Sequence, residues 1–271
     1  YGARRIIEKI EITVEDKKPE SYKSFSSSEL NAADREEVMN NILDACIFPL
    51  IRQRPFNKVA NPNDVPRDIF VSAYNTAPLS VNVSKVIQNN KDQFQAGLTA
   101  LSKLTGGSVY LSSQKPMEFD NVTNVTIEGP HPAGNVGIQI HHIKPINPGE
   151  VIWTVNAQHV ITIGKLFQNG QYDPGCIVSI GGSGSSNPQT VRALTGSSIG
   201  SLLKDQLLSG SQRIISGDVL TGKRVSSDDY LGFYDSSVAI INDDVKRPFL
   251  GMLAVGSSST TVSYTHLRAH E

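Results

Sequence analysis

The chain has 271 residues, of which 38% are hydrophobic and 19% charged, and its formal net charge at pH 7 is −1. This length allows one large domain or two medium ones, and the composition excludes collagen, coiled-coil and disordered chains. A net charge so close to zero supplies no field that would hold a phosphate polymer, so we expect no nucleic-acid partner.

The first 27 residues are predicted to be the end of an N-terminal β domain followed by a linker. Residues 5–14 alternate apolar and polar side chains, as a half-buried strand does. Residues 17–28 carry a proline and three consecutive serines, which is typical of a linker. Since the sequence begins with Tyr1, we expect it to open inside a domain.

Residues 28–130 are predicted to form a Rossmann-like α/β domain. Apolar residues recur at helical spacing after Asn31, which could cap the helix, and again over residues 91–104, where Gly106 and Gly107 follow. Short, mostly apolar strands are predicted over residues 67–74 and 108–111. This strand–helix–strand order indicates a parallel sheet covered by helices.

Residues 131–255 are predicted to form a β-rich, β-grasp-like domain. A strand is expected over residues 138–143, and further strands at 176–180, 190–194 and 212–220, with one short helix at 202–208. The apolar run 151–167 contains Lys165, whose burial at the centre of a bilayer would cost about 3 kcal/mol, so we expect no membrane crossing there.

The last segment, residues 256–271, is predicted to be a linker and a non-native tail. Residues 262–271 resemble one reading frame of a sequencing-library adaptor. His266 and His270 are therefore excluded from the candidate site residues.

Two glycine-rich motifs suggest chemistry but also have simpler interpretations. The run 181–186 could cradle a phosphate, yet a strand rather than a helix is predicted after it, which favours a hairpin loop. The motif G-x-S-x-G over residues 196–200 would place Ser198 on a nucleophile elbow. The general-base histidine would have to follow Ser198, and only the excluded tail supplies one, which favours a turn with Ser197 or Ser198 as a helix cap.

The remaining polar candidates are histidines, cysteines and a pair of arginines. In a strand His141 and His142 would point to opposite faces, and no ligand spacing indicates a metal site. Cys46 and Cys176 are predicted to be buried, inert thiols. Arg52 and Arg54, just before Pro55 and Phe56, could hold an anion or an aromatic ring, although capping of a helix end is the simpler interpretation.

Several segments resemble one family of respiratory proteins. Residues 52–59 (RQRPFNKV), 69–73 (IFVSA), 129–134 (GPHPAG), 153–164 and 213–220 (RIISGDVL) are similar, in the same order, to the A subunit of the bacterial Na⁺-translocating NADH:quinone reductases. The similarity extends over about residues 1–255, so the sequence resembles a fragment of that protein.

The resemblance implies a peripheral subunit on the cytoplasmic face of the bacterial inner membrane, which contacts the membrane only through partner subunits. It implies support of quinone reduction coupled to Na⁺ export, as one component of a multisubunit enzyme and without independent catalysis. It also implies that this chain binds no redox cofactor, that quinone is a possible ligand, and that flavins and iron–sulfur centres lie on the partner subunits. The implied fold is a Rossmann-like domain followed by a soluble ligand-binding β-grasp domain.

No catalytic and no metal-ligating residue can be named from the sequence. If a quinone pocket exists, we expect it at the junction of the two domains. His131 and the backbone of Ala133 and Gly134 would then address a quinone carbonyl, and Phe56 would offer a ring face. Two alternatives remain open: a serine hydrolase that uses Ser198, and an assembly scaffold without a ligand.

Overall fold

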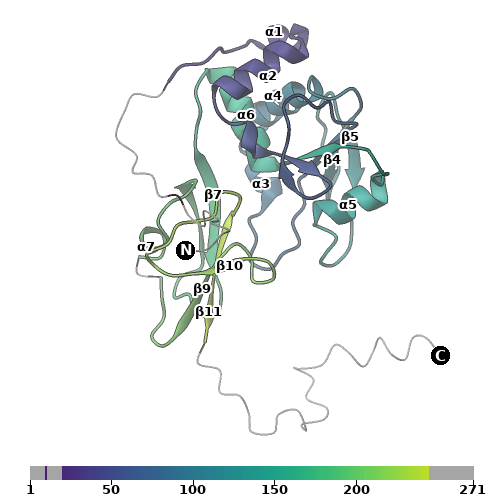
Figure 1. Ribbon diagram of the computed structural model, residues 1–271. Coiled ribbons are helices and arrows are strands. Elements are labelled where there is room, and N and C mark those ends of the chain that lie inside the picture. Colours follow the sequence, from purple (N-terminus) through teal and green to yellow (C-terminus); the bar gives the residue numbers. More distant parts are fainter. Residues whose placement is uncertain (1–9, 11–19, 205, 244–271) are drawn as a thin grey trace, which may run out of the picture.

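The computed structural model of the protein describes residue 10, residues 20–204 and residues 206–243 (Figure 1). The strand predicted over residues 5–14 and the tail at 262–271 lie outside these ranges. The described chain is a mixed α/β structure with two mixed sheets. The prediction of an α/β domain followed by a β-rich domain is therefore confirmed.

The first sheet comprises six strands and is covered by most of the helices. Its strands are β1 (Ile51–Arg54), β2 (Lys58–Val59), β3 (Ile69–Ser72), β4 (Val109–Ser113), β5 (Thr123–Thr126) and β6 (Ile152–Asn156). The helices are α1 (Ser27–Ala32), α2 (Arg35–Asp44), η1 (Phe48–Leu50), α3 (Val83–Gln88), α4 (Lys91–Ser102), α5 (Val136–Ile143) and α6 (Ala157–Asn169).

The strand order of this sheet is β2-β1-β6-β3-β4-β5. The four strands β6, β3, β4 and β5 are parallel, and the β1–β2 hairpin extends the sheet antiparallel to β6. From β3 the chain proceeds to β4 and β5 on one side, and it later returns to β6 on the other side. β3 and β6 thus flank a topological switch point, where open α/β sheets commonly bind ligands.

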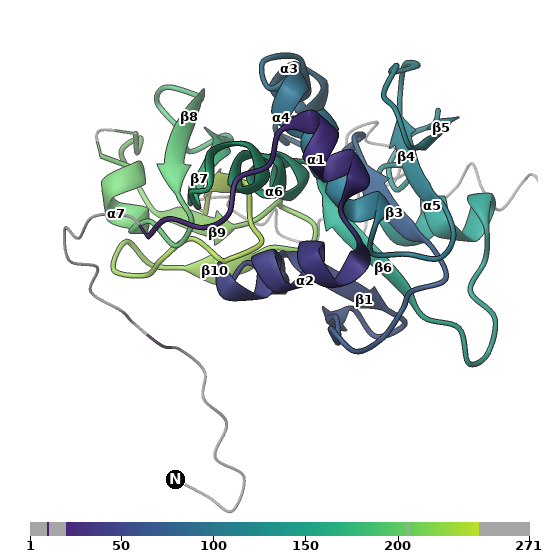
Figure 2. The same cartoon turned by 90° about the horizontal axis from the view of Figure 1, so that it is seen from above.

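The central strands β3 and β6 of the first sheet are buried on both faces, and the two faces carry different helices (Figure 2). Along β6 the side chains alternate: Trp153 packs into the main core with α2, α4 and α6, and its ring meets Phe48 edge-on at 5.7 Å between centroids. Ile152 faces the other way and forms a smaller cluster with Phe70 of β3 and Ile140 of α5. This double coverage explains why β3 and β6 read as mostly apolar runs.

Two glycines allow helices α4 and α6 to pack unusually closely. A Cβ atom added to Gly97 would lie 2.1 Å from the carbonyl oxygen of Val160, and one added to Gly164 would lie 1.7 Å from that of Gln93. The backbones of the two helices are in direct contact here, which leaves no room for a side chain.

The second sheet has five strands in the order β10-β9-β11-β7-β8. Its elements are β7 (Gly175–Gly181), β8 (Gln189–Leu194), α7 (Ile199–Leu202), β9 (Gln212–Ser216), β10 (Lys223–Val225) and β11 (Ser237–Asn242). The neighbouring strands β7 and β11 are parallel. β8 pairs antiparallel with β7 on one side, and β9 and then β10 continue the sheet by antiparallel pairing on the side of β11. This is the arrangement of a β-grasp sheet. The loop at 182–188 joins antiparallel β7 and β8, so the predicted hairpin loop is confirmed.

Several local predictions differ from the structure. Residues 131–172 were expected to open the second domain. Instead they supply strand β6 to the first sheet and the helices α5 and α6 that pack on its two faces. Residues 136–143 form a helix rather than a strand, because Val136, Ile140 and Ile143 lie on one helical face against the sheet. The short helix expected at 202–208 is not found at these residues; helix α7 spans Ile199–Leu202 and so ends where the predicted helix was to begin.

The helix predicted after Asn31 is α2, and a further helix that was not predicted, α1, comes before it with its own cap. Ser26 forms a capping box with Glu29 at the start of α1, and Asp34 accepts the Glu37 amide at the start of α2. Asn31, expected as the cap, lies within α1. No helix in the described ranges combines the length and the hydrophobicity that a bilayer crossing requires.

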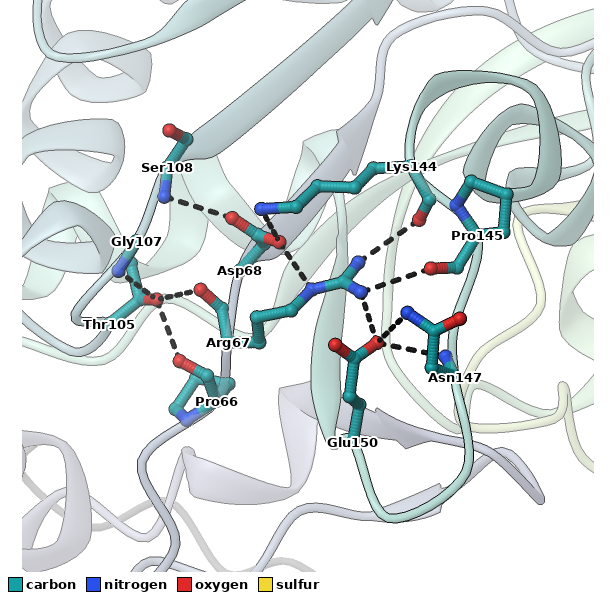
Figure 3. Close-up of polar contacts among 10 residues, drawn as sticks. All are labelled: Pro66, Arg67, Asp68, Thr105, Gly107, Ser108, Lys144, Pro145, Asn147 and Glu150. Carbon is teal, nitrogen blue, oxygen red and sulfur yellow. Dashed lines mark hydrogen bonds and ion pairs between the residues drawn. The ribbon is translucent and has the colours of Figure 1, made fainter.

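An ionic cluster around the buried Asp68 joins three segments at the amino end of β3 (Figure 3). We call Arg67, Asp68, Lys144 and Glu150 the Asp68 cluster. The fully buried carboxylate of Asp68 accepts from Arg67 Nε and Lys144 Nζ, both at 2.7 Å, and from the Ser108 amide at 3.1 Å. The Arg67 guanidinium also bonds Glu150 and the carbonyls of residues 144 and 145. The cluster therefore ties the loop before β6 to β3.

Candidate functional site

Two loops meet at the carboxyl ends of the parallel strands. One is the loop 73–82 after β3, and the other is the loop 127–135 after β5. Tyr74 donates its hydroxyl to the Gly129 carbonyl at 3.2 Å, which links the two loops at their bases. In an open parallel sheet this edge is where ligands bind, so we take these loops as the candidate site.

Thr76 is the hub of this site. Its Oγ1 accepts the Gly134 amide at 3.0 Å and lies 3.1 Å from Nδ1 of His131. Because the hydroxyl proton is not used toward Gly134, it is free to be donated to Nδ1. The His131 tautomer that accepts this proton at Nδ1 carries its own proton on Nε2. Within the described residues Nε2 makes no hydrogen bond, so in that tautomer the half-buried ring offers one free donor.

The neighbouring backbone amides are already occupied. Ala133 donates its N–H to the Pro130 carbonyl at 2.9 Å, and Gly134 donates to Thr76. The Ala133 carbonyl accepts from the side chain of the buried Gln139. The backbone of Ala133 and Gly134 therefore holds the loop in shape, and its N–H groups are not free for a ligand carbonyl.

Gly134 is required by contact rather than by an unusual φ angle. A Cβ atom at this position would lie 2.4 Å from the Thr76 nitrogen and 2.7 Å from its Oγ1. A Cβ atom does not approach nonbonded heavy atoms this closely, so any side chain here would push the two loops apart.

The second sheet packs against this carboxyl edge. Ser179 of β7 donates its hydroxyl to the Leu79 carbonyl at 2.6 Å. The side-chain amide of Gln158, at the start of α6, makes two hydrogen bonds with the backbone of Ile177, of 3.0 and 2.7 Å. These contacts fix β7 beside the switch point between β3 and β6.

A narrow cavity lies in this junction, lined by α6 and by the ends of β7 and of the 228–236 loop. His159 and Tyr234 line it, with ring centroids 6.1 Å apart, and the Tyr234 hydroxyl donates to the Pro49 carbonyl at 2.9 Å. Burial lowers the pKa of His159 to about 4, against a hydrogen bond to the Leu50 carbonyl that raises it. His159 is therefore neutral at physiological pH and acts as a packing and hydrogen-bonding group.

Phe56 does not join the other candidate residues. Arg54 pairs with Ile152, the first residue of β6, so the β1–β2 turn lies at the amino edge of the parallel strands. His131 lies at the carboxyl edge. The expected combination of Phe56 with His131 in one pocket is therefore not formed, although Phe56 is 89% exposed at its own edge.

The hydrolase alternative finds no support at Ser198. This residue occupies the N-cap position of α7, a helix of four residues, and its side chain makes no capping hydrogen bond. The preceding strand β8 is an antiparallel strand at the edge of its sheet, whereas a nucleophile elbow follows a parallel strand. The hydroxyl of Ser197, by contrast, closes the turn by bonding the backbone of Leu194.

The other polar candidates lie apart from the site. His141 and His142 are neighbours on α5, and in the part of the chain that is described no three potential metal ligands gather. Both cysteines are free thiols; Cys46 is exposed, so its predicted burial was wrong, and Cys176 is partly buried. Arg52 and Arg54 lie on β1 rather than at a helix end.

Sequence reasoning missed the residues that hold the site together. Thr76 was not singled out, although a threonine next to an Asx turn at the end of a buried strand is a usable signal. The Asp68 cluster and the Tyr234 contact join residues 75 or more positions apart, which no local pattern reveals.

The fold and the site define a class of protein: a Rossmann-like sheet whose carboxyl edge is covered by a β-grasp-like sheet. Comparison with known families refines this. Residues 33–172 match the family described as "NqrA second alpha/beta domain", and residues 177–227 match "NQRA C-terminal domain". The first match covers more than half of the chain, so the chain belongs to the NqrA family.

Curated relatives carry the corresponding protein name. The chain is 35% identical over 272 residues to the A subunit of the Na(+)-translocating NADH-quinone reductase of Saccharophagus degradans, and 33% identical over 272 residues to the protein of the same name from Pasteurella multocida. Both alignments cover 98% of this chain but 61% of the relative. The chain thus spans less than two thirds of these relatives.

Among solved structures, the fold is similar to a chain of an NAD⁺-reducing NiFe-hydrogenase in the H2-reduced state. The TM-score is 0.53 with 13% identity, covering 81% of this chain and 51% of that one. At this identity the similarity concerns the fold alone.

Proposed function

We propose that this chain is part of the peripheral A subunit of a Na⁺-translocating NADH:quinone reductase, where it supports quinone reduction coupled to Na⁺ export. The observation that carries the proposal is the match of 98% of the chain to relatives of that name, across both sheets. The partners would be the other subunits of the complex, and the location would be the cytoplasmic face of the bacterial inner membrane, where NADH is available.

In this proposal the chain carries no redox cofactor, and flavins and iron–sulfur centres lie on the partner subunits. Two observations support this. The two cysteines are too few to hold an iron–sulfur cluster. The β6–α6 junction passes directly from Asn156 to Ala157, without the glycine-rich turn that holds a dinucleotide.

Quinone is the ligand we propose for the loop pair at the carboxyl edge. Nε2 of His131 would donate a hydrogen bond to a quinone carbonyl, while Thr76 fixes the ring through Nδ1. Ala133 and Gly134 would shape the loop around it. Phe56 is excluded from this pocket by its position at the other edge.

Equilibrium dialysis of the full chain with a short-chain soluble ubiquinone tests the ligand. His131→Ala should weaken binding by about tenfold, the effect of losing one hydrogen bond, and Phe56→Ala should leave it unchanged. Equal binding by wild type and His131→Ala would refute the site. No binding by the wild-type chain would leave an assembly scaffold as the function.

Membership of the complex is tested by exchange of segments. The region of the Saccharophagus degradans protein that aligns with residues 20–243 is replaced by these residues, and the tagged chimera is expressed in a strain that lacks the native copy. We expect the chimera to copurify with the remaining subunits. A chimera that is folded but purifies alone would contradict the proposal.

A further inference from the structure

The β1–β2 hairpin carries positive charge without a counter-charge. Arg52 and Arg54 are two residues apart on β1, so their side chains lie on the same face of the strand, and Lys58 follows in β2. Residues 50–60 contain these three cations and no acidic residue. We call Arg52, Arg54 and Phe56 the hairpin surface.

Neither arginine forms an ion pair with any described carboxylate. The Arg52 guanidinium donates to the Asn57 carbonyl and stacks over the Tyr234 ring at 4.4 Å. For Arg54 the structure shows no hydrogen bond within residues 20–204 and 206–243. The Nε groups of both side chains are buried without a partner.

The two guanidinium groups also oppose each other. Burial lowers the pKa of Arg54, and the charge of Arg52 lowers it further. Buried N–H donors are rarely left without an acceptor, and two like charges side by side favour an anion between or beside them. The hairpin surface therefore has the chemistry of an anion-binding surface that is completed by another molecule.

Its shape favours a protein segment over a small ion. Phe56 is 89% exposed and Val59 43% exposed, which is apolar surface that a phosphate would not cover. β2 is also the edge strand of the first sheet. A carboxylate accepts two parallel hydrogen bonds from a guanidinium, and an apolar side chain beside it would cover Phe56.

We propose that Arg52, Arg54 and Phe56 form a docking surface for an acidic segment of a partner protein, in which one or more carboxylates bond the two guanidinium groups and an apolar residue covers the phenyl ring. This inference rests on the proposed function, since the partner is taken to be another component of the same complex. The surface lies at the amino edge of the parallel strands, at the opposite end from the His131 loops.

Site-specific photocrosslinking tests the docking surface. Phe56 is replaced by p-benzoylphenylalanine in the full-length chimera, which is assembled in membranes, irradiated and digested. Because Phe56 is so exposed, this substitution should not disturb folding. The expected adduct is a peptide of another protein of the complex, with Asp or Glu within a few residues of the crosslinked position.

Charge reversal separates docking from folding. Arg52→Glu with Arg54→Glu should reduce the crosslink yield at least about tenfold, since two charge-assisted contacts are lost. Arg224→Glu, the same change at an exposed residue of β10, should leave the yield unchanged. Circular dichroism and thermal unfolding identify variants that have lost their fold. If the charge-reversal variant has lost its fold, Arg54→Lys takes its place. It keeps the positive charge but lacks the paired N–H donors of the guanidinium, so it should still lower the crosslink yield.

Other outcomes would overturn the inference. A crosslink that survives charge reversal in folded protein, an adduct without nearby carboxylates, or no adduct in an assembled complex would each do so. Saturable stabilisation of the isolated chain by inorganic phosphate, lost in the Arg52/Arg54 variant and accompanied by no crosslink, would instead assign a small-anion site. If the wild-type chimera fails to assemble at all, the proposed function has failed rather than this surface.

Discussion

Replacing Asp68 by asparagine tests the role of the Asp68 cluster in stabilising the fold. The carboxylate is fully buried and accepts from two cations at 2.7 Å and from one amide at 3.1 Å. Removing one partner of a buried ion pair costs about 3–5 kcal/mol. Lys144 is 43% exposed and Arg67 keeps Glu150, so both cations are partly compensated. We therefore expect a loss near the lower limit, about 3 kcal/mol.

Urea unfolding of the full chain measures this loss as a lower midpoint at unchanged slope. The control is Lys23→Ala, which removes an exposed pair with Glu37 and should cost less than about 1 kcal/mol. Burial alone raises the pKa of Asp68, but hydrogen bonds from Lys144, Ser108 and Arg67 bring it below its ordinary value. The stabilisation should thus be present above about pH 4 and be lost as the pH falls further. An Asp68→Asn protein within about 1 kcal/mol of wild type would refute this reasoning.

Three further predictions concern the junction and the close contacts. Gly134→Ala should destabilise the chain by about 1–3 kcal/mol and raise hydrogen exchange in the 73–82 loop. The control Gly137→Ala, which has open space around it, should do neither. Equal hydrogen exchange in the two variants would contradict the close contact between Gly134 and Thr76. Gly164→Ala should lower the thermal midpoint although alanine favours helices, because its Cβ would meet the Gln93 carbonyl; a raised midpoint would show that propensity dominates. Burial lowers the pKa of His159 to about 4, so between pH 6.5 and 4 this histidine is protonated in the unfolded chain but neutral in the folded one. The free energy of unfolding should therefore decrease as the pH falls through that range. His159→Gln should remove this part of the pH dependence, and identical pH profiles of the two proteins would contradict it.

The sequence predicts those elements whose signal is local. The helix α4 shows apolar residues at helical spacing and ends before two glycines, and β3 is a short apolar run between polar loops. Both are found where they were expected. The hairpin loop between β7 and β8 was predicted for the same reason, since a strand on each side of a glycine-rich segment leaves few alternatives.

Where two patterns overlap, the prediction failed. Residues 138–143 contain Ile138, Ile140 and Ile143, which fit an alternating strand as well as a helix, and only packing against Phe70 selects the helix. The apolar run 151–167 contains a strand and a helix in direct succession. Asn156, which caps the helix, was the only local sign of that junction.

The candidate site could be predicted only in part. The GPHPAG segment marks a rigid loop, and His131 was correctly placed in it, but its partner Thr76 lies 55 residues earlier. The separation of Phe56 from His131 follows from the antiparallel pairing of β1 with β6, which depends on strand order rather than on sequence pattern.

We propose that this chain supports a Na⁺-translocating NADH:quinone reductase. The most direct measurement is quinone reduction by NADH in membranes where the chimera replaces the native protein, with and without Na⁺. We expect that the chimera restores Na⁺-stimulated activity and that membranes lacking both proteins do not show it. A folded, membrane-associated chimera without Na⁺-stimulated quinone reduction would contradict this proposed function.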